Sequence, residues 1–395
     1  MMSGSEQVTG DSSVEPDVRK ILCVGRVCFD IVYTCTHFPS EDSTLRSVDY
    51  RWQRGGNASN TCTVLSLLSQ PCELLACLSA EEHISFLQND LRKYKIDCSH
   101  CPVIEGIGCP IATILLSLST GTRTIVYHNQ NLPDLTFKDF EQLNLEEYSW
   151  IHFEGRNVDK VLLMIQRIED YNDSLRGAES DMHDESAKNR VPITISAELE
   201  SPRSERLLDL LPYVDVAFVA KDFAKNQGLN SMNEVMQTIG QDGKSRGTLI
   251  CAWSEEGAIA RTACGAIVRS PAYPPQKVID TLGAGDTFNA AVLYYLNKIK
   301  AEFTYKCKQE VTCASDYNQA KDRSFDQDIT VRGDIEQNAR IKSTKYNRQD
   351  FIDKTSLQRA IKFACCIAGA KVGLRGYDCL DKISSDILQQ DFLIH

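Results

Sequence analysis

The amino-acid sequence predicts an α/β protein: a doubly wound, mainly parallel sheet with helices on both faces, plus a small separate β-sheet. The 395 residues are 42% hydrophobic and 25% charged, an ordinary globular composition with enough apolar residues for a large core. Short apolar runs alternate along the chain with helical segments, which predicts the large sheet. Two β-rich stretches without intervening helices predict the small one.

The strands of the large sheet are predicted from five short runs that are apolar or nearly so. Runs of this length are typical of parallel strands buried on both sides. They lie at 21–25, 151–155, 193–197, 214–219 and 248–253. Helical segments such as 161–168 and 207–211 lie between them, and helical periodicity appears again over 357–368.

The small sheet is predicted from residues 31–50 and 111–127, where the hydrophobic pattern partly alternates. Within the second stretch, the segments 111–116 and 124–127 flank Ser119-Thr120-Gly121, which is typical of a hairpin turn. We interpret the two stretches as a lid over a ligand site, with approximate bounds of 27–54 and 104–130.

The domain organisation follows from where these patterns stop. Residues 1–18 form a polar tail, and 19–395 form one domain. Within it, 173–190 is a charged, polar loop. The segment 298–354 has mixed charge, few large apolar residues and no clear period, so we predict an insertion that is disordered or lies on the surface.

Charge and cysteine content narrow the function classes. The net charge of −11 argues against general nucleic-acid or anionic-membrane binding. The start of the chain lacks the apolar run of a signal peptide, and no stretch approaches the ~20 apolar residues that span a bilayer. The sixteen cysteines are therefore predicted to be reduced thiols, and the protein to be cytoplasmic.

The segment DTLGAGDTFNA at 280–290 carries the strongest functional signal. Apolar residues follow it at helical spacing, so a helix with one buried face begins there. The backbone N–H groups of Gly283, Ala284 and Gly285 would point from its positive end toward an anion. Asp286 beside them is placed to accept a proton from an attacking hydroxyl. The alternative is an ordinary helix N-cap.

This segment resembles the second signature of the ribokinase-like carbohydrate kinases, the pfkB family. A second segment, RWQRGGNASNTCTVLSLL at 51–68, resembles the sugar-binding Gly-Gly-Asn segment of that family. Its Trp-Gln-Arg before Gly-Gly-Asn is similar to the ketohexokinase branch rather than to ribokinases or adenosine kinases in general. The resemblance spans roughly 19–298 and 356–381 and implies a ribokinase-like fold. The insertion at 298–354 is the largest departure from the family pattern.

The resemblance also implies a reaction, the ATP-dependent phosphorylation of D-fructose at its 1-hydroxyl. Asp286 would act as general base, and the N–H groups of Gly283, Ala284 and Gly285 would stabilise the transition-state charge. Two alternatives stay open. One is another ribokinase-like kinase with a different sugar or a nucleoside as acceptor. The other is a non-catalytic sugar or ATP sensor on the same fold.

The sugar site implied by the family consists of Asp30, Gly56, Asn57 and Asn60. Glycine lets the backbone approach a ligand, and amides suit hydroxyls because both donate and accept hydrogen bonds. Without the family, Asp30 would be interpreted as a turn-capping residue and Asn57 as a helix N-cap. Asp42 matches a lid acid that reaches the neighbouring subunit's site in dimers of the family; the alternative is an exposed acid before a strand.

The nucleotide side is implied by three further matches. Arg123, at the rim of the lid, matches an arginine that clamps phosphate, although an isolated strand arginine is more often solvated. The segment Ala252, Trp253, Ser254 and Glu255 resembles the nucleotide-side loop of ketohexokinases. Trp253 either stacks on adenine or belongs to the core. Cys365, in the last strong helix, completes the adenine pocket.

Metal and partner expectations also come from the family. Mg²⁺ is needed to neutralise the phosphates. The Asn-x-x-Glu motif of many relatives is missing, which leaves Glu198, Glu200 and Asp222 as candidate ligands and the site unassigned. Relatives commonly respond to K⁺, for which no ligand is identified. The lid pairs subunits in ketohexokinases and ribokinases, which implies a homodimer.

Overall fold

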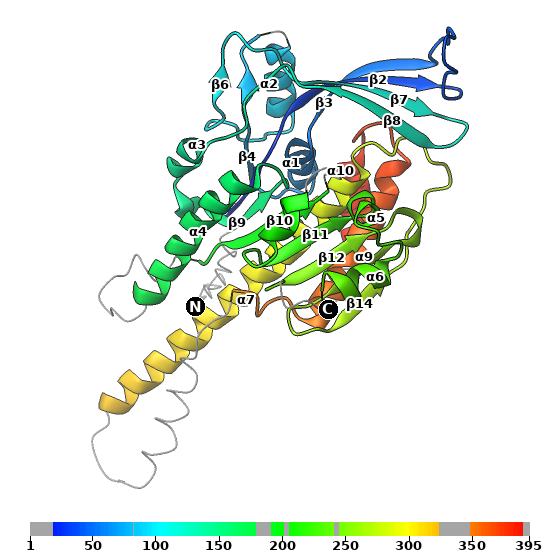
Figure 1. Cartoon of the computed structure of the whole chain (residues 1–395). Coiled ribbons are helices and arrows are strands. Elements are labelled where there is room, and N and C mark those ends of the chain that lie inside the picture. The colour runs from blue at the N-terminus through cyan, green and yellow to red at the C-terminus, as the bar shows by residue number, and fades with distance from the viewer. Residues whose placement is uncertain are drawn as a thin grey trace, which may run out of the picture.

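The structure, a computed structural model, describes residues 19–81, 83–178, 191–200, 205–240, 245–323 and 348–389. These form an eight-stranded sheet with helices on both faces and a separate four-stranded sheet that projects from one end (Figure 1). The predicted α/β class and the predicted small sheet are therefore confirmed. The predicted polar tail lies outside the described residues.

The large sheet has the strand order β14-β13-β12-β11-β10-β9-β1-β4. Its six strands from β12 to β4 run parallel, and β13 and β14 are antiparallel additions at one edge. Every residue of β9 and β10 is buried, which explains why these strands appear in the sequence as continuous runs. The strands are β1 (Lys20–Val24), β4 (Cys72–Leu75), β9 (Tyr148–Phe153), β10 (Thr194–Leu199), β11 (Val216–Ala220), β12 (Thr248–Ala252), β13 (Ala258–Arg261) and β14 (Ile267–Ser270).

Helices pack against the two faces through two separate hydrophobic clusters. The first cluster holds residues of α1 (Asn57–Leu67), α2 (Ile84–Lys93), α7 (Ala284–Arg323), α9 (Lys354–Val372) and α10 (Leu380–Ile387). The second holds residues of α3 (Phe137–Glu141), α4 (Val158–Ala178), α5 (Lys221–Asn226) and α6 (Met232–Thr238), with the 3₁₀ helices η1 (Leu145–Glu147) and η3 (Glu205–Leu210). A third 3₁₀ helix, η4 (Ser254–Glu256), follows β12.

The small sheet has the order β3-β2-β7-β8. Its strands are β2 (Cys28–Cys35), β3 (Asp49–Gly55), β7 (Ile111–Ser117) and β8 (Thr122–His128), and a two-stranded sheet joins β5 (Leu78–Ser79) to β6 (Val103–Ile104). One face of the small sheet packs on Leu282, just before α7, through Val32, Ala112, Ile114 and Leu116. This contact ties the small sheet to the segment that carries Asp286.

The predicted insertion at 298–354 was too wide at both ends. Helix α7 continues without a break to Arg323, and Lys300 on it is buried, with its Nζ 2.6 Å from the carbonyl oxygen of Ser149. At the other end, Arg348 Nε lies 2.7 Å from the buried carboxylate of Asp215. These charges resemble surface residues in the sequence because their partners are distant along the chain. Residues 324–347 lie outside the described part.

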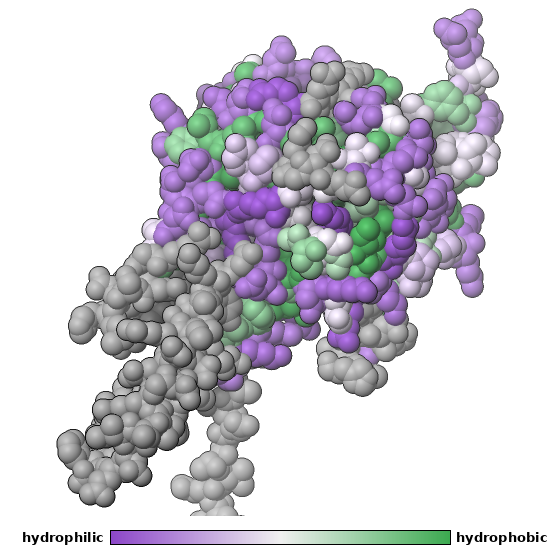
Figure 2. Space-filling model, turned by 60° about the horizontal axis from the view of Figure 1, so that its bottom comes forward, coloured by the Kyte–Doolittle hydropathy of each residue, from purple (hydrophilic) through white to green (hydrophobic). Residues whose placement is uncertain are grey.

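The predicted polar loop at 173–190 also began too early, since α4 extends to Ala178. Residues 179–190 lie outside the described part of the chain. The face shown in Figure 2 is largely hydrophilic, with apolar residues gathered in limited patches. Within the described ranges, no helix combines the length and hydrophobicity that crossing a bilayer requires.

Candidate active site

The residues predicted around the Asp286 segment converge at the carboxyl edge of the large sheet. The starts of α1 and α7 meet there, under the small sheet (Figure 1). The carboxyl ends of β9 and β10 add Glu154, Glu198 and Glu200 to the same region. This is the edge at which open parallel sheets commonly bind their ligands.

Asp286 lies in the first turn of α7, which begins at Ala284, so it is not the N-cap. Its side chain is buried, and its Oδ2 accepts a hydrogen bond from Asn60 Nδ2 at 2.8 Å. Burial raises the pKa of the Asp286 carboxyl well above its ordinary value, and the neighbouring Glu198 and Glu200 carboxylates raise it further. The carboxylate is thus held in surroundings that favour proton uptake.

The start of α7 has the features of an anion site. The N–H of Ala284 donates to Thr281 and that of Thr287 to Gly283, whereas the N–H of Gly285 meets no acceptor among the described residues. A side chain added at Gly285 would enter open space. Free N–H donors at the positive end of a long helix, with open space beside them, suit a phosphate group.

Asp280 holds the segment before α7 in place. Its Oδ1 accepts from the N–H of Leu282 at 2.9 Å, and its Oδ2 lies 2.6 Å from Arg51 Nη2 on β3. Lys371, buried on α9, donates to the carbonyl oxygens of Asp280 and Leu282. These contacts fix the backbone that leads into Gly283 from two directions.

Glu198 is the centre of a polar network at the end of β10. It accepts hydrogen bonds from Asn57 Nδ2 at 3.0 Å and Asn289 Nδ2 at 3.1 Å, and its Oε1 lies 3.0 Å from His152 Nε2. Burial opposes ionisation of Glu198, but the hydrogen bonds and charge of these partners lower its pKa. Asn57, predicted to contact sugar, also donates to Glu200. The helix N-cap here is Gly56, not Asn57.

Glu200 completes the acidic edge of the site. Burial raises its pKa to about 7, and the Glu198 and Glu154 carboxylates add to that effect. Two of the three candidate magnesium ligands, Glu198 and Glu200, therefore lie together. The third, Asp222, is an exposed residue in the first turn of α5. Among the described residues, no three His, Cys, Asp or Glu side chains form a ready metal-binding group.

Asp30 lies within β2, not in a turn, and its carboxylate packs against Gly55 on the neighbouring strand β3. A side chain at Gly55 would overlap that carboxylate, which explains the glycine. Gly56 has a φ of 97°, and a Cβ there would lie 2.2 Å from the carbonyl oxygen of Arg26. Burial raises the pKa of Asp30 to about 7, although a hydrogen bond from Cys28 opposes the shift.

Among the described residues, three buried polar atoms around this site lack a hydrogen-bond partner. They are Gln53 Nε2, Asn60 Oδ1 and the Tyr377 hydroxyl. Buried polar groups are rarely left unpaired, because the desolvation is not compensated. Their positions on β3, α1 and the segment after α9 therefore indicate a ligand rich in hydroxyl groups.

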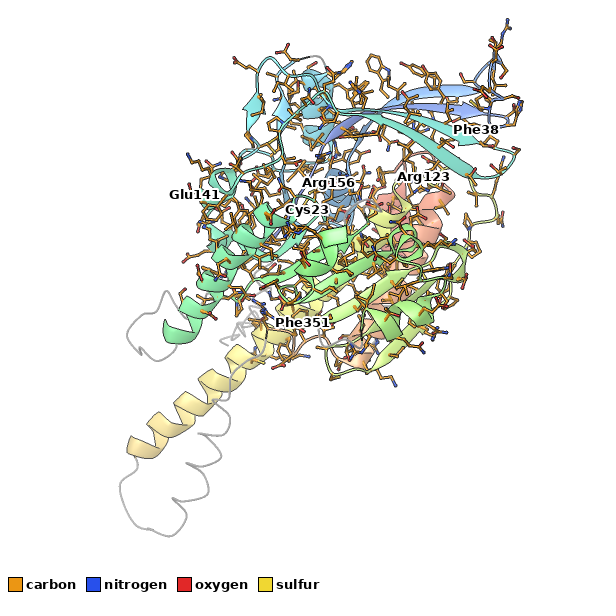
Figure 3. All side chains as sticks on the ribbon, viewed as in Figure 1. Cys23, Phe38, Arg123, Glu141, Arg156 and Phe351 are labelled. Atoms are coloured by element: carbon orange, nitrogen blue, oxygen red, sulfur yellow. The ribbon has the colours of Figure 1, made fainter. Side chains whose placement is uncertain are left out.

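The nucleotide-side residues are spread over four elements, β8, β12, η4 and α9. Arg123 is exposed on β8, between the small sheet and the main body of the protein (Figure 3). Ser254 and Glu255 are exposed on η4, after the half-buried Ala252. Cys365 is buried on α9.

Trp253 is only 2% exposed and belongs to the second hydrophobic cluster. The core interpretation of this tryptophan therefore fits the structure, and adenine stacking does not. Asp42 lies in the exposed connection between β2 and β3, at a φ of 56°. Phe38, in the same connection, is found at the outer end of the small sheet, away from the start of α7 (Figure 3).

Sequence reasoning missed three residues near the site. Arg156, three residues after the end of β9, forms an ion pair with Glu154, and although burial opposes this, the Glu154 and Glu200 charges raise its pKa. Lys371 is the single cation in the otherwise apolar run 363–374, which is a usable signal. Tyr377 follows Gly376 in a turn and carries no sequence signal.

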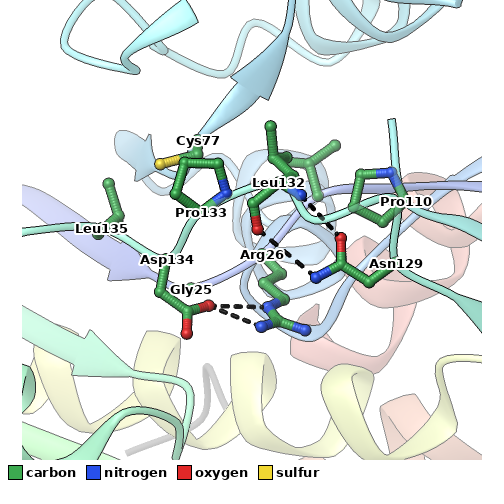
Figure 4. Close-up of a pocket in the computed structure, with 10 residues that line it drawn as sticks. Gly25, Arg26, Cys77, Pro110, Asn129, Leu132, Pro133, Asp134 and Leu135 are labelled. Carbon is green, nitrogen blue, oxygen red and sulfur yellow. Dashed lines mark hydrogen bonds and ion pairs between the residues drawn. The ribbon is translucent and has the colours of Figure 1, made fainter. Parts of the chain in front are cut away.

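A small pocket lies on the other side of the β1–β2 connection (Figure 4). Its lining includes Gly25, Val27, Cys77 and Pro110, and an ion pair of 2.6 Å joins Arg26 to Asp134 beside it. None of the predicted site residues lines this pocket.

Comparisons with known proteins agree with this geometry. The sequence profile of the pfkB family carbohydrate kinases matches residues 18–315. Ketohexokinase from Mus musculus is 36% identical over 362 residues, which cover 91% of this chain and 98% of that protein. A nucleoside kinase from Methanocaldococcus jannaschii is 22% identical over 279 residues, which cover 70% of this chain and 83% of that protein.

Solved structures share the fold at lower identity. Ribokinase from Giardia lamblia superposes with a TM-score of 0.67 at 16% identity, covering 94% of this chain and 99% of that one. Ribokinase from Arabidopsis thaliana, solved with ribose and ATP, gives a TM-score of 0.63 at 14% identity, with 94% and 98% covered. These neighbours have the same α/β architecture as this chain.

Proposed function

This chain belongs to the pfkB family of carbohydrate kinases, and we propose that it is a ketohexokinase that uses ATP to phosphorylate D-fructose at the 1-hydroxyl. As a member of that family, it is a phosphotransferase acting on a sugar hydroxyl. One observation carries the finer proposal. The buried Asp286 carboxylate accepts a hydrogen bond from Asn60 at the free N-terminus of α7, beside unpaired polar atoms suited to a polyol.

Asp286 acts in this proposal as the general base. The oxygen of the acceptor's primary hydroxyl attacks the γ-phosphorus of ATP, and its proton passes to the Asp286 carboxylate. The new P–O bond forms as the bond between the γ-phosphorus and the leaving ADP oxygen breaks. The raised pKa of Asp286 favours proton uptake. The N–H groups of Gly283 and Gly285 face the charge that develops on the phosphoryl oxygens, and the N–H of Ala284 joins them by leaving its 3.3 Å hydrogen bond to the carbonyl oxygen of Thr281.

The acceptor is bound in this proposal by Asp30, Gly56, Asn57 and Asn60. Asp30 and Asn60 are buried, so a sugar hydroxyl that binds to them does not compete with bulk water for their hydrogen bonds. In this proposal Asp42 reaches the sugar site of a second subunit, because it lies at the outer end of the small sheet. The dimer would form through the outer face of that sheet, where Trp52 and Val126 are exposed.

ATP is bound in this proposal by Arg123, Ala252, Ser254, Glu255 and Cys365, with the start of α7. Glu198 and Glu200 offer the oxygen ligands that Mg²⁺ prefers, and Mg²⁺ would neutralise phosphate charge. The raised pKa of Glu200 is consistent with a cluster of carboxylates whose repulsion a bound cation would reduce. A response to K⁺ and a cytoplasmic location are further parts of the proposal, and no K⁺ ligand is assigned.

Two other functions compete with this proposal. The nucleoside kinase relative favours a kinase with another acceptor, since the phosphoryl machinery is compatible with both. A sugar or ATP sensor is the second candidate. The buried Asp286 argues against it, because a sensor gains nothing from a costly buried carboxylate.

The test is ADP release from Mg·ATP by the full chain, with D-fructose, ribose, adenosine or no acceptor. We expect fructose-dependent release in the wild type and a loss of at least about 100-fold in Asp286→Asn. Asp159→Asn is the matched control, because Asp159 is an exposed acid in the first turn of α4. ADP release with ribose or adenosine but not with D-fructose would show that the acceptor is a different one. Near-wild-type turnover by Asp286→Asn would show that Asp286 is not the general base.

A further inference from the structure

The Tyr377 hydroxyl is buried and has no hydrogen-bond partner in the part of the chain that the structure describes, although the segment around it is held firmly. The preceding N–H, from Gly376, donates to Asp280 Oδ2 at 3.0 Å. The Nζ of Lys371 lies 5.5 Å from the centroid of the Tyr377 ring. The segment that carries the tyrosine is therefore anchored to the same aspartate that holds the start of α7.

The hydroxyl points at the catalytic segment. A Cβ added at Gly283 would lie 2.3 Å from Tyr377 Oη and 3.7 Å from Asn60 Nδ2, so the Tyr377 hydroxyl and the Asn60 amide both lie beside Gly283. Asn60 donates to Asp286 through that nitrogen and leaves its own Oδ1 unpaired. Burial raises the pKa of Tyr377, with added effects from the charge of Asp286 and of other nearby carboxylates. The phenol therefore stays a neutral donor and acceptor.

The chemistry around the hydroxyl favours a neutral partner. The cations near this segment already have partners. Arg51 and Lys371 are engaged by Asp280 and by backbone carbonyl oxygens. Arg54 pairs with Asp90, and Arg375 pairs with Asp49. A phosphate would find no free cation here among the described contacts. A sugar hydroxyl can accept from the phenol and donate to Asn60 Oδ1 at once, which satisfies two of the three unpaired atoms.

We propose that Tyr377 is a specificity-determining residue whose hydroxyl binds a hydroxyl of the acceptor sugar, next to Asn60 and Gln53. The inference rests on the proposed function and extends it, since it adds the segment after α9 to the sugar site. That segment also anchors Asp280, so acceptor binding is coupled to the backbone that presents Asp286.

The experiment compares Tyr377→Phe with the wild type and with Tyr148→Phe. Tyr148 is the matched control, because its buried hydroxyl donates to Glu73 at 2.8 Å and it begins β9, at the opposite edge of the sheet. KM is measured for D-fructose, for its single-centre epimers D-psicose, D-tagatose and L-sorbose, and for ATP. Melting temperatures are measured without ligand.

We expect Tyr377→Phe to raise the KM for D-fructose roughly 3- to 10-fold, the range of one hydrogen bond, and to leave the KM for ATP within about twofold. For the epimer whose hydroxyl turns away from Tyr377, the variant and the wild type should have equal KM values. The melting temperature should not fall, because the lost hydroxyl is unpaired in the free protein. Tyr148→Phe should lower the melting temperature and change no KM.

An unchanged KM for every sugar in Tyr377→Phe would overturn the inference. So would a KM that rises by the same factor for all four sugars together with a lower melting temperature, since this indicates a structural role. If the wild type uses ribose or adenosine instead, the proposed function fails while the same comparison on that acceptor still decides the role of Tyr377. If no acceptor releases ADP or raises the melting temperature of the wild type, both ideas are wrong.

Discussion

Carboxylates at the sheet edge define the candidate site at the scale of single residues. Burial raises the pKa values of Asp30, Glu200 and Asp286, and those of Asp30 and Glu200 reach about 7. Clustered carboxylates raise each other's pKa values because like charges repel in a poorly solvated space. The ligand-free protein therefore carries an unfavourable charge arrangement at the place where the proposed Mg²⁺ would offset part of it.

This arrangement predicts how the stability of the free protein depends on pH. Asp30 has an ordinary pKa of 3.8 when unfolded and about 7 when folded, so between these values unfolding releases its proton. Stability from this group is complete below pH ~4 and is lost as the pH rises through 7. The full effect is roughly 4 kcal/mol, from three pH units at 1.36 kcal/mol each.

The measurement is the free energy of unfolding of wild type and Asp30→Asn from pH 4 to 8, without ligand. The variant lacks the titrating group, so its stability relative to the wild type should increase with pH and level off above about 7. Asp159→Asn, an exposed change of the same charge, should show no such trend. A difference between Asp30→Asn and wild type that does not vary with pH would contradict the raised pKa.

At the scale of elements, three parts of the fold meet at Asp280. Arg51 on β3, Lys371 near the end of α9 and Gly376 after it all bind this residue, which precedes α7. The start of α7 is therefore positioned by the small sheet and by the C-terminal helices together. Leu282 adds an apolar contact with the small sheet. The N–H groups of the anion site depend on this junction together with Thr287 of α7, which donates to the carbonyl oxygen of Gly283.

Lys371→Met should weaken that junction. The change leaves the carbonyl oxygens of Asp280 and Leu282 without their donor, so we expect the free energy of unfolding to fall by roughly 3 kcal/mol. We also expect kcat to fall about tenfold or more, because the loop that presents the N–H groups loosens. Lys354→Met, at the exposed start of the same helix, is the control. Unchanged unfolding and unchanged kcat would show that the lysine does not hold the loop.

At the scale of the whole molecule, the small sheet has two different faces. The inner face packs on Leu282, above the site. The outer face exposes Tyr50, Trp52 and Val126, of which Val126 is 63% accessible. Apolar side chains exposed on both edge strands of one sheet face are typical of a surface that another molecule covers. The proposed homodimer supplies a second copy of the same face.

Val126→Glu should separate such a dimer. A buried, unpaired carboxylate is costly, so we expect light scattering with size exclusion to report twice the chain mass for the wild type and a single chain for the variant. Ile267→Glu, which changes an apolar residue that is 48% accessible on the edge strand β14, should leave the mass unchanged. A wild type with the mass of a single chain would show that no dimer forms. A Val126→Glu variant that remains dimeric would show that the subunits meet through another surface.

The sequence by itself determined the large sheet, the small sheet and the segment around Asp286. These follow from local patterns, because a buried parallel strand is a continuous apolar run and a helix that starts after Gly-Ala-Gly exposes its N–H groups wherever it packs. Only the tertiary structure decided which charges are buried. Lys300, Arg348 and Lys371 have the sequence character of surface residues, and their partners lie far away along the chain.

The same reason separates the parts of the site. Asp286 could be predicted because its neighbours in sequence are also its neighbours in space. Tyr377 could not, since its closeness to Gly283 arises only when the segment after α9 folds back onto Asp280. A buried hydroxyl has a hydrogen-bond partner only where atoms from several elements come together, and a local sequence pattern does not predict such contacts.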